Sequence, residues 1–199
     1  WGFMPFTQST HYLGLVAIIF AILGALLRKP DKVEWFFWVT TFLALVIGFG
    51  SFFPILFKPF YSILPLFSKF RIPSMIYVLL AITLPFLAAK GLDSFLQTGD
   101  KKSSFKKGVL VIGGLIGLTI FLIIGGEYFL EFSSPKDGRF NPSVISQLKV
   151  ERIDLFQKGL RLALGIGLGT LGLLWGFINK AINKTVFSSL LIGLVVLDL

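Results

Sequence analysis

The sequence contains no cysteine, a single histidine and few charged residues. Without cysteine, the chain has no disulfide, no thiolate metal ligand and no cysteine nucleophile. With His11 as its one histidine, it has no site that requires two imidazoles. Charged residues make up 15% of the 199 residues, whereas an ordinary globular domain has about 25%. This shortage of charge, together with the apolar content described next, excludes an ordinary soluble domain.

The sequence is instead rich in apolar residues. Hydrophobic residues make up 55% of the chain, phenylalanine alone supplies 23 residues, and the mean hydropathy is +0.85. Apolar runs of about 20 residues cross the hydrocarbon core of a bilayer as helices. We therefore predict an all-α fold, a polytopic transmembrane helix bundle formed by one region over residues 1–199. The six predicted spans lie near residues 12–27, 33–50, 74–89, 109–126, 160–178 and 186–199.

The net charge of +9 is interpreted as basic loops held against anionic lipid headgroups, and no nucleic-acid partner is expected. Basic residues are dense in the short polar stretches at 28–32, 90–107 and 179–184. Such density near span ends is typical of the cytoplasmic side. The raw count does not separate the two sides, because ten basic residues fall on one and nine on the other.

Two stretches on the predicted outer side are not simple turns. Residues 51–73 are hydrophobic but carry four prolines, which prevent one continuous helix. We expect this stretch to be an interfacial or re-entrant segment. In the second stretch, residues 127–159, Asn141 and Pro142 are typical of a helix N-cap followed by a first-turn proline. They predict an interfacial helix that leads into the fifth span.

The strongest candidate site is the basic pair Lys69 and Arg71, just before the third span. A guanidinium fork, an ammonium group and the free N–H groups of a helix start together suit a phosphate or pyrophosphate. Ser74 is expected to be the N-cap of that helix and to reach the same anion. The alternative is that both basic side chains only extend to lipid headgroups.

Other residues are weaker candidates. His11, Lys58 and Glu127 are candidate substrate contacts, and His11 also suits acid–base work, although an interfacial structural role is the alternative. Glu127 and Glu131 share a helix face if the fourth span continues outward, and a carboxylate pair serves acid–base work or holds a divalent ion. The alternative is a solvated helix end. Asp198 is an acidic residue inside an apolar run, which is a functional hypothesis by default.

The glycines of the fifth span match a nucleotide-binding string but lack its context. Residues 167–172 read G-x-G-x-x-G, yet they lie inside a span with no strand before them. The spacings of Gly165 to Gly169 and of Gly172 to Gly176 predict close packing between helices.

Several strings together resemble a known family. They are WGFMPFT at residues 1–7, YLG at 12–14, LPLFSKFRIPS at 64–74 and GLD at 91–93. The chain resembles the YfhO family of bacterial polytopic membrane proteins over nearly its whole length, and that family is similar to the GT-C class of glycosyltransferases. On this resemblance the sequence looks like an internal fragment of a longer protein.

The resemblance implies a multi-pass protein of the bacterial cytoplasmic membrane that binds a polyprenyl-phosphate-linked sugar at the outer face. It would transfer the sugar to a cell-envelope polymer or lipid. Arg71, Lys69 and Ser74 would hold the donor phosphate, and the catalytic acidic residue would lie upstream of this sequence. No cofactor or metal site is expected, and dependence on a divalent ion stays open. The alternative is a non-catalytic protein, either a transporter of lipid-linked saccharides or an assembly scaffold.

Overall fold

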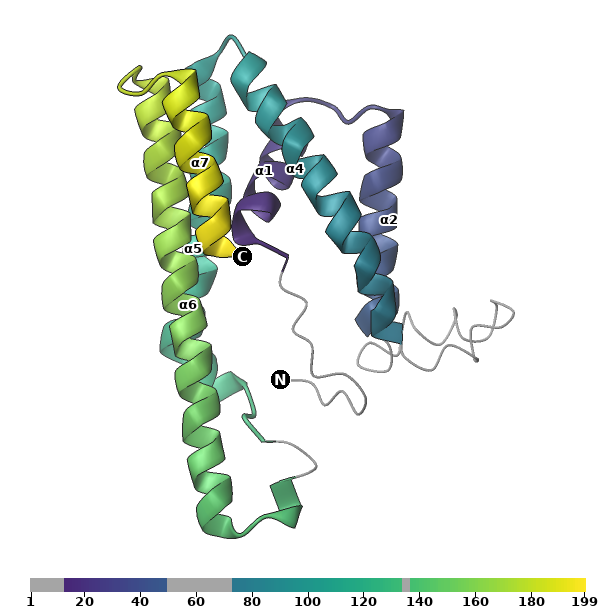
Figure 1. The fold of residues 1–199 in the computed structure, drawn as a ribbon, viewed down its shortest axis with the longest axis vertical. Helices are drawn as coiled ribbons and strands as arrows, with labels where there is room; N and C mark the ends of the chain where they lie inside the picture. Colours follow the sequence, from purple (N-terminus) through teal and green to yellow (C-terminus); the bar gives the residue numbers. More distant parts are fainter. Residues whose placement is uncertain (1–12, 50–72, 134–136) are drawn as a thin grey trace, which may run out of the picture. The chain divides into compact units, whose positions relative to one another are not determined.

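The computed structural model describes residues 13–49, 73–133 and 137–199, without the side chains at 49, 73–75 and 139. The described residues form helices and contain no strand, which confirms the predicted all-α class. The helices are shown in Figure 1. In chain order they are α1 (Leu15–Leu27), α2 (Lys32–Phe49), the 3-10 helix η3 (Pro73–Leu79), α4 (Leu80–Gln97), α5 (Lys101–Phe129), the 3-10 helix η4 (Asp137–Arg139), α6 (Pro142–Ile178) and α7 (Lys184–Asp198).

Each predicted span falls on one of the six α-helices in the described residues. Three segments are long and apolar enough to cross a membrane, namely Ile76–Gln97, Lys101–Phe129 and Pro142–Ile178. The apolar helix α1 has 13 residues, and at 1.5 Å per residue it rises only about 20 Å. Length and composition thus support three crossing helices, and the count of six crossings stays a prediction.

The prediction that the basic stretch at residues 90–107 is a loop is wrong. Helix α4 continues to Gln97 and α5 begins at Lys101, so only residues 98–100 connect them. Asp100 caps the start of α5, because its carboxylate accepts a hydrogen bond from the N–H of Ser103 at 3.0 Å. The lysines that mark the end of hydrophobic sequence do not mark the end of the helix, since lysine is a good helix former.

The predicted interfacial helix and the fifth span are one helix. Asn141 is the N-cap and Pro142 the first helical residue, as predicted, although the Asn141 side chain makes no capping hydrogen bond. The helix then runs without a break for 37 residues, which is about 55 Å at 1.5 Å per residue. Because the hydrocarbon core is only about 30 Å thick, the polar first half of α6 extends beyond the length that a membrane would cover.

The helices form two compact units, one within Gln8–Lys107 and one within Gly108–Asp198, called here the N-terminal and C-terminal units. In the N-terminal unit, α4 packs against both α1 and α2 (Figure 1). The rings of Phe37 on α2 and Phe86 on α4 stack with centroids 4.0 Å apart. The buried core of this unit contains Ala21, Ala44, Leu80, Leu84 and Leu87.

The backbones of α1 and α4 are in close contact at Gly24 and Gly91. A Cβ atom on Gly91 would overlap the carbonyl oxygen of Phe20 and lie 3.2 Å from the nitrogen of Gly24. A Cβ on Gly24 would overlap the Cα of Gly91. Both overlaps are with backbone atoms, which cannot move aside cheaply. The two helices therefore need glycine at both positions to pack as they do.

Helix α2 is fixed at two further places, one on α4 and one on η3. Thr41 donates a hydrogen bond to Thr83 of α4 at 2.8 Å, and both residues are buried. Near the end of α2, the ring of Tyr77 covers Gly48, where a Cβ would overlap it. Since Tyr77 is near the end of η3, this contact places the junction of η3 and α4 beside the end of α2.

In the C-terminal unit, α5 and α6 are antiparallel. The ring of Phe156 covers Gly126 near the end of α5, and Leu174 lies against Gly108 near its start. Between these contacts, the side-chain amide of Gln157 donates to the carbonyl of Ile123 at 3.1 Å. A half-buried polar side chain between helices thus satisfies its own hydrogen bond on the neighbouring helix.

The glycine spacings of the fifth span gave a prediction that is only partly right. A Cβ on Gly169 would lie 3.3 Å from Leu194 of α7, and one on Gly176 would lie 3.6 Å from Ile182. Gly165 and Gly172 meet no heavy atom within 4 Å among the described residues. The close contact of two backbones occurs instead at Gly24 and Gly91, a pair split between two helices that sequence spacing does not reveal.

Replacing Gly91 by alanine is expected to lower the thermal unfolding midpoint of the purified protein, because the added methyl group would force α1 and α4 apart. Overpacking of this kind costs roughly 1–3 kcal/mol. The matched control is Gly114→Ala, since Gly114 lies within α5 and meets no heavy atom within 4 Å. The control should be neutral or stabilising by up to about 1 kcal/mol, the difference in helix propensity. Equal midpoints for both variants would contradict the packing described.

Candidate functional site

Most of the predicted site residues lie outside the described residues: His11, Lys58, Lys69 and Arg71. Ser74 is described in its backbone, and there the prediction is wrong. The helix begins at Pro73, so Ser74 is the second residue of η3 and not its N-cap. Proline suits the first helical position because its φ angle is fixed near the helical value and its missing N–H would have no partner there.

The predicted acidic candidates separate in the structure. Glu127 is exposed in the last turn of α5, which ends at Phe129. Glu131 follows the helix end and is also exposed, so the two carboxylates do not share a helix face and that expectation is wrong. Asp198 is buried at the end of α7. In the part of the chain that the structure describes, no three His, Asp or Glu side chains gather to hold a metal ion.

The structure brings together a polar cluster that the sequence analysis missed. Arg28 follows α1 directly and pairs with the carboxylate of Glu34 on α2. The same guanidinium donates through Nε to the hydroxyl of Ser94 on α4 at 2.7 Å. One arginine at the end of α1 therefore joins α1, α2 and α4. The Arg28 cluster comprises Arg28, Asp31, Glu34, Lys90 and Ser94.

Within the Arg28 cluster, Asp31 and Glu34 form a reciprocal capping box at the start of α2. The N–H of Glu34 donates to the Asp31 carboxylate at 2.8 Å, and the N–H of Asp31 donates to Glu34 at 3.1 Å. The hydrogen bond from the Glu34 N–H holds the pKa of the Asp31 carboxyl below its usual value, with the ammonium of Lys90 acting in the same direction. That ammonium lies 3.9 Å from Asp31.

This cluster is a structural lock between helices and has no room for a substrate. The cavity that it lines holds about 10 Å³, which is about the space of one water molecule. Its carboxylates are already paired with cations or with backbone N–H groups. The signal that would have found it is the Asp-x-x-Glu spacing at residues 31–34, which marks a helix start.

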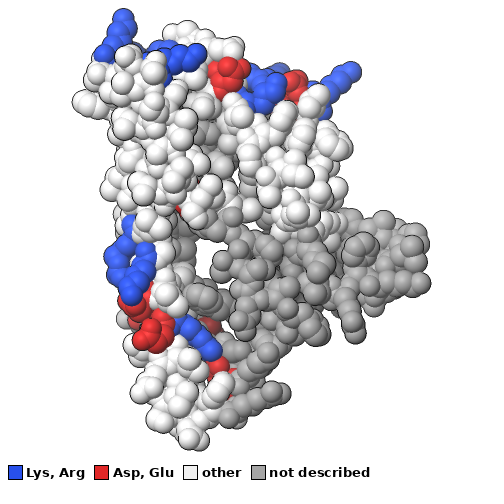
Figure 2. Space-filling model, in the orientation of Figure 1, with Lys and Arg blue, Asp and Glu red and all other residues white. Residues whose placement is uncertain are grey.

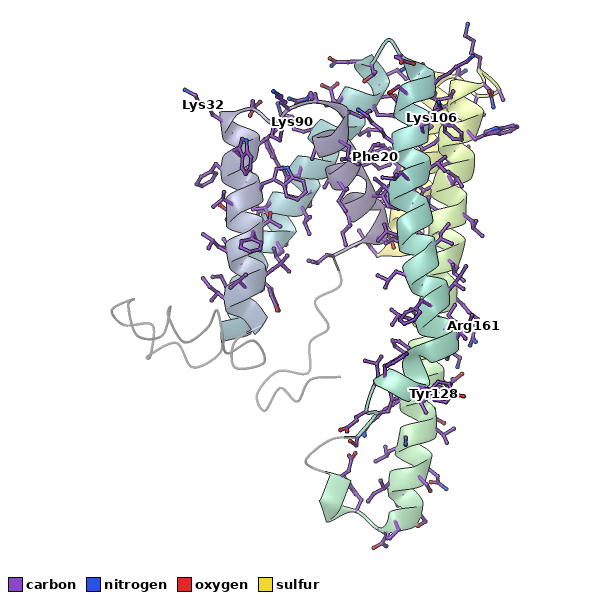
Figure 3. The ribbon with its side chains drawn as sticks, turned by 180° about the vertical axis from the view of Figure 1, so that it is seen from behind. Phe20, Lys32, Lys90, Lys106, Tyr128 and Arg161 are labelled. Carbon is purple, nitrogen blue, oxygen red and sulfur yellow. The ribbon has the colours of Figure 1, made fainter. Side chains whose placement is uncertain are left out.

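The basic stretches at 28–32 and 90–107 come together at one end of the N-terminal unit. Besides the Lys90–Asp31 contact, the ammonium of Lys107 donates to the carbonyl of Leu26 at 2.7 Å. Figure 2 shows basic and acidic side chains at the end of the unit where α2 begins, and Figure 3 shows Lys32 and Lys90 there. The sequence analysis assigned both stretches to one side of the membrane, and this contact agrees with that grouping.

A second cluster holds the connection between α5 and α6. The guanidinium of Arg152 on α6 donates to both carboxylate oxygens of Asp137, at 2.6 and 2.8 Å. It also donates to the carbonyl of Phe132 at 3.0 Å. The ring of Phe132 is buried against Phe156. This bidentate pair fixes the connection and leaves the arginine fork without room for an added anion.

The larger cavity is an apolar groove of about 440 Å³ in the N-terminal unit, which is within the range of ligand-binding pockets. Its wall contains no acid, base or nucleophile, so the groove suits binding and not group transfer. The residues that line the groove, called here the α1–α2 groove, are Ala25, Pro30, Trp35, Trp38, Val39, Phe42 and Leu43.

Comparison with known proteins finds no family model, no curated protein and no solved structure that matches the chain. The resemblance to the YfhO family therefore stays a prediction, which rests on the residues quoted for it. What the described residues show is the helix that begins at Pro73, the two polar clusters and the α1–α2 groove.

Replacing Arg28 by alanine is expected to destabilise the protein by about 2–4 kcal/mol, because it leaves the carboxylate of Glu34, 6% exposed, without its cation. The double variant Arg28→Ala/Glu34→Ala should be more stable than Arg28→Ala, since it also removes the stranded charge. Lys158→Ala is the control, because its pair with Asp154 is exposed and exposed pairs contribute under about 1 kcal/mol. Thermal unfolding of the four proteins measures this. A double variant less stable than Arg28→Ala would contradict the lock.

Proposed function

We propose that this chain is part of an integral membrane protein of the glycosyltransferase type. It binds a polyprenyl-phosphate-linked sugar at the outer face of a bacterial cytoplasmic membrane and transfers the sugar to a cell-envelope polymer or lipid. Lys69 and Arg71 grip the donor phosphate, with Ser74 and the helix start beside them. The catalytic acidic residue lies in another part of the protein.

The observation that carries the proposal is the position of Lys69 and Arg71 directly ahead of a helix that begins at Pro73. The first N–H groups of a helix have no carbonyl partner within it and favour an anion. A guanidinium adds a bidentate fork for phosphate oxygens. In the N-terminal unit, the contact between Tyr77 and Gly48 puts η3 beside the end of α2, whereas the Arg28 cluster is at the start of α2.

The rival function is passage of a lipid-linked saccharide through the membrane without chemistry, or a scaffold role. Transporters carry polar or broken helices near the bilayer midplane. The apolar stretches of α5 and α6 contain no charged residue between Val109 and Ile124 or between Leu162 and Ile178. This distribution favours chemistry at the membrane surface over passage through the interior.

In the full-length protein, Arg71→Ala is expected to reduce sugar transfer by at least about 100-fold, because a charged hydrogen-bond donor to the donor phosphate is lost. Arg71→Lys should also impair transfer, since an ammonium has no bidentate fork. Arg161→Ala is the matched control, because Arg161 is an exposed arginine on α6. The measurement is transfer of radiolabelled sugar from polyprenyl phosphate in proteoliposomes, at matched expression.

The same proteoliposomes separate the enzyme from its rival. Transfer of sugar to an acceptor supports the proposal, whereas movement of the intact lipid-linked sugar between leaflets without transfer supports a transporter. Unchanged transfer by Arg71→Ala would remove Arg71 from the donor site and overturn the assignment.

A further inference from the structure

The α1–α2 groove exists because α1 and α2 both pack against α4 and leave an apolar opening between them. On α2 the groove is lined by Trp35, Trp38, Val39 and Phe42, which recur at the spacing of one helix face. This face is not covered by the unit itself, since Trp35 is 59% and Phe42 is 61% exposed. In water, such a patch of large apolar side chains would be costly.

One end of the groove carries positive charge. Arg28 and Lys90 are neutralised by Glu34 and Asp31 in the Arg28 cluster. Lys29 and Lys32 are exposed, and neither forms an ion pair with any residue that the structure describes. Two unneutralised ammonium groups therefore remain in this turn.

Both lysines lie close to residues of the groove wall along the chain. Lys29 precedes Pro30, which is part of the groove wall. Lys32 lies one helical turn before Trp35, so the two side chains share a face of α2. Figure 3 shows Lys32 at the start of α2, beside the connection to α1. An apolar channel with tryptophans near its mouth and ammonium groups at its rim has the polarity of a phospholipid: a hydrocarbon chain below and an anionic headgroup above.

We propose that the α1–α2 groove binds an anionic phospholipid, with one acyl chain along Trp35, Val39 and Phe42 and the headgroup phosphate between Lys29 and Lys32. The two charges of the rim complement an acidic headgroup, and they give no advantage to a zwitterionic one. This site uses other residues than the proposed donor site, and it does not depend on glycosyltransferase activity.

The test uses quenching of tryptophan fluorescence by brominated lipid, which requires close contact. The full chain carries Trp1→Phe and Trp175→Phe, so that Trp35 and Trp38 are the only tryptophans left. Detergent micelles are titrated with phosphatidylglycerol or phosphatidylcholine brominated on one acyl chain. We expect half-maximal quenching by phosphatidylglycerol at a mole fraction about ten-fold or more below that of phosphatidylcholine, since each basic residue near an anionic lipid contributes roughly a five-fold affinity.

Two variant pairs separate the headgroup and chain parts of the site. Lys29→Gln/Lys32→Gln should abolish the preference for phosphatidylglycerol. Lys180→Gln/Lys184→Gln, which removes the same charge from two exposed residues at the start of α7 and in the turn before it, should keep it. Ala25→Phe should fill the groove and reduce quenching by both lipids. Its control is Leu26→Phe at the neighbouring exposed position, outside the groove wall, which should leave quenching unchanged.

Three results would overturn the proposal. Equal quenching by the two lipids in the starting protein would show that the groove takes lipid without headgroup selection. A preference that survives Lys29→Gln/Lys32→Gln would place the anion elsewhere. Absence of quenching by either lipid would mean that a protein segment, and not lipid, covers the groove.

Discussion

The N-terminal unit depends on the contact between two backbones at Gly24 and Gly91. Lipid tails are as apolar as leucine side chains, so helices in a membrane gain little from hydrophobic burial against each other and associate through close packing. At this crossing there is no side chain between α1 and α4. The close approach brings the end of α1 beside Ser94, which lets Arg28 reach a hydroxyl on α4 and a carboxylate on α2. The polar lock is therefore a consequence of the glycine contact.

The Arg28 cluster in turn determines which charges remain available. The turn after α1 and the start of α2 contain three basic residues and two acidic ones, and Lys90 of α4 adds a fourth basic residue beside them. Pairing with Glu34 and Asp31 uses Arg28 and Lys90 to hold the helices, and Lys29 and Lys32 keep their charge beside an apolar groove. The basic residues behind the net charge of +9 thus have different roles. Some of it is structural, and some of it can attract an anionic lipid.

Much of the fold could be predicted from residue types along the chain, because a helix in lipid must satisfy its own backbone hydrogen bonds and therefore forms wherever apolar sequence is long enough. The errors occurred where the helix outlasted the apolar run. Lys90, Asp93 and Lys101 look like loop residues, yet they lie within helices, and the charged stretch 149–161 continues the same helix as the fifth span. Hydropathy reports where a helix meets lipid, and it does not report where the helix ends. The helix begins at Pro73, whose fixed φ angle suits the first helical position. The prediction of Ser74 as the N-cap overlooked this local preference.

The sequence by itself determined the helical class, the approximate position of each helix and the excess of positive charge, since these follow from local composition. It also led to the proposal of Lys69 and Arg71 as an anion site, which rests on their order along the chain. Only the tertiary structure decided that Gly24 meets Gly91, that Arg28 joins three helices, and that Trp35 and Phe42 line a groove beside Lys29 and Lys32. These features combine residues from different helices, and two of them join α1 to α4. Their contacts depend on the rotation and spacing of each helix against α4, which no local pattern specifies.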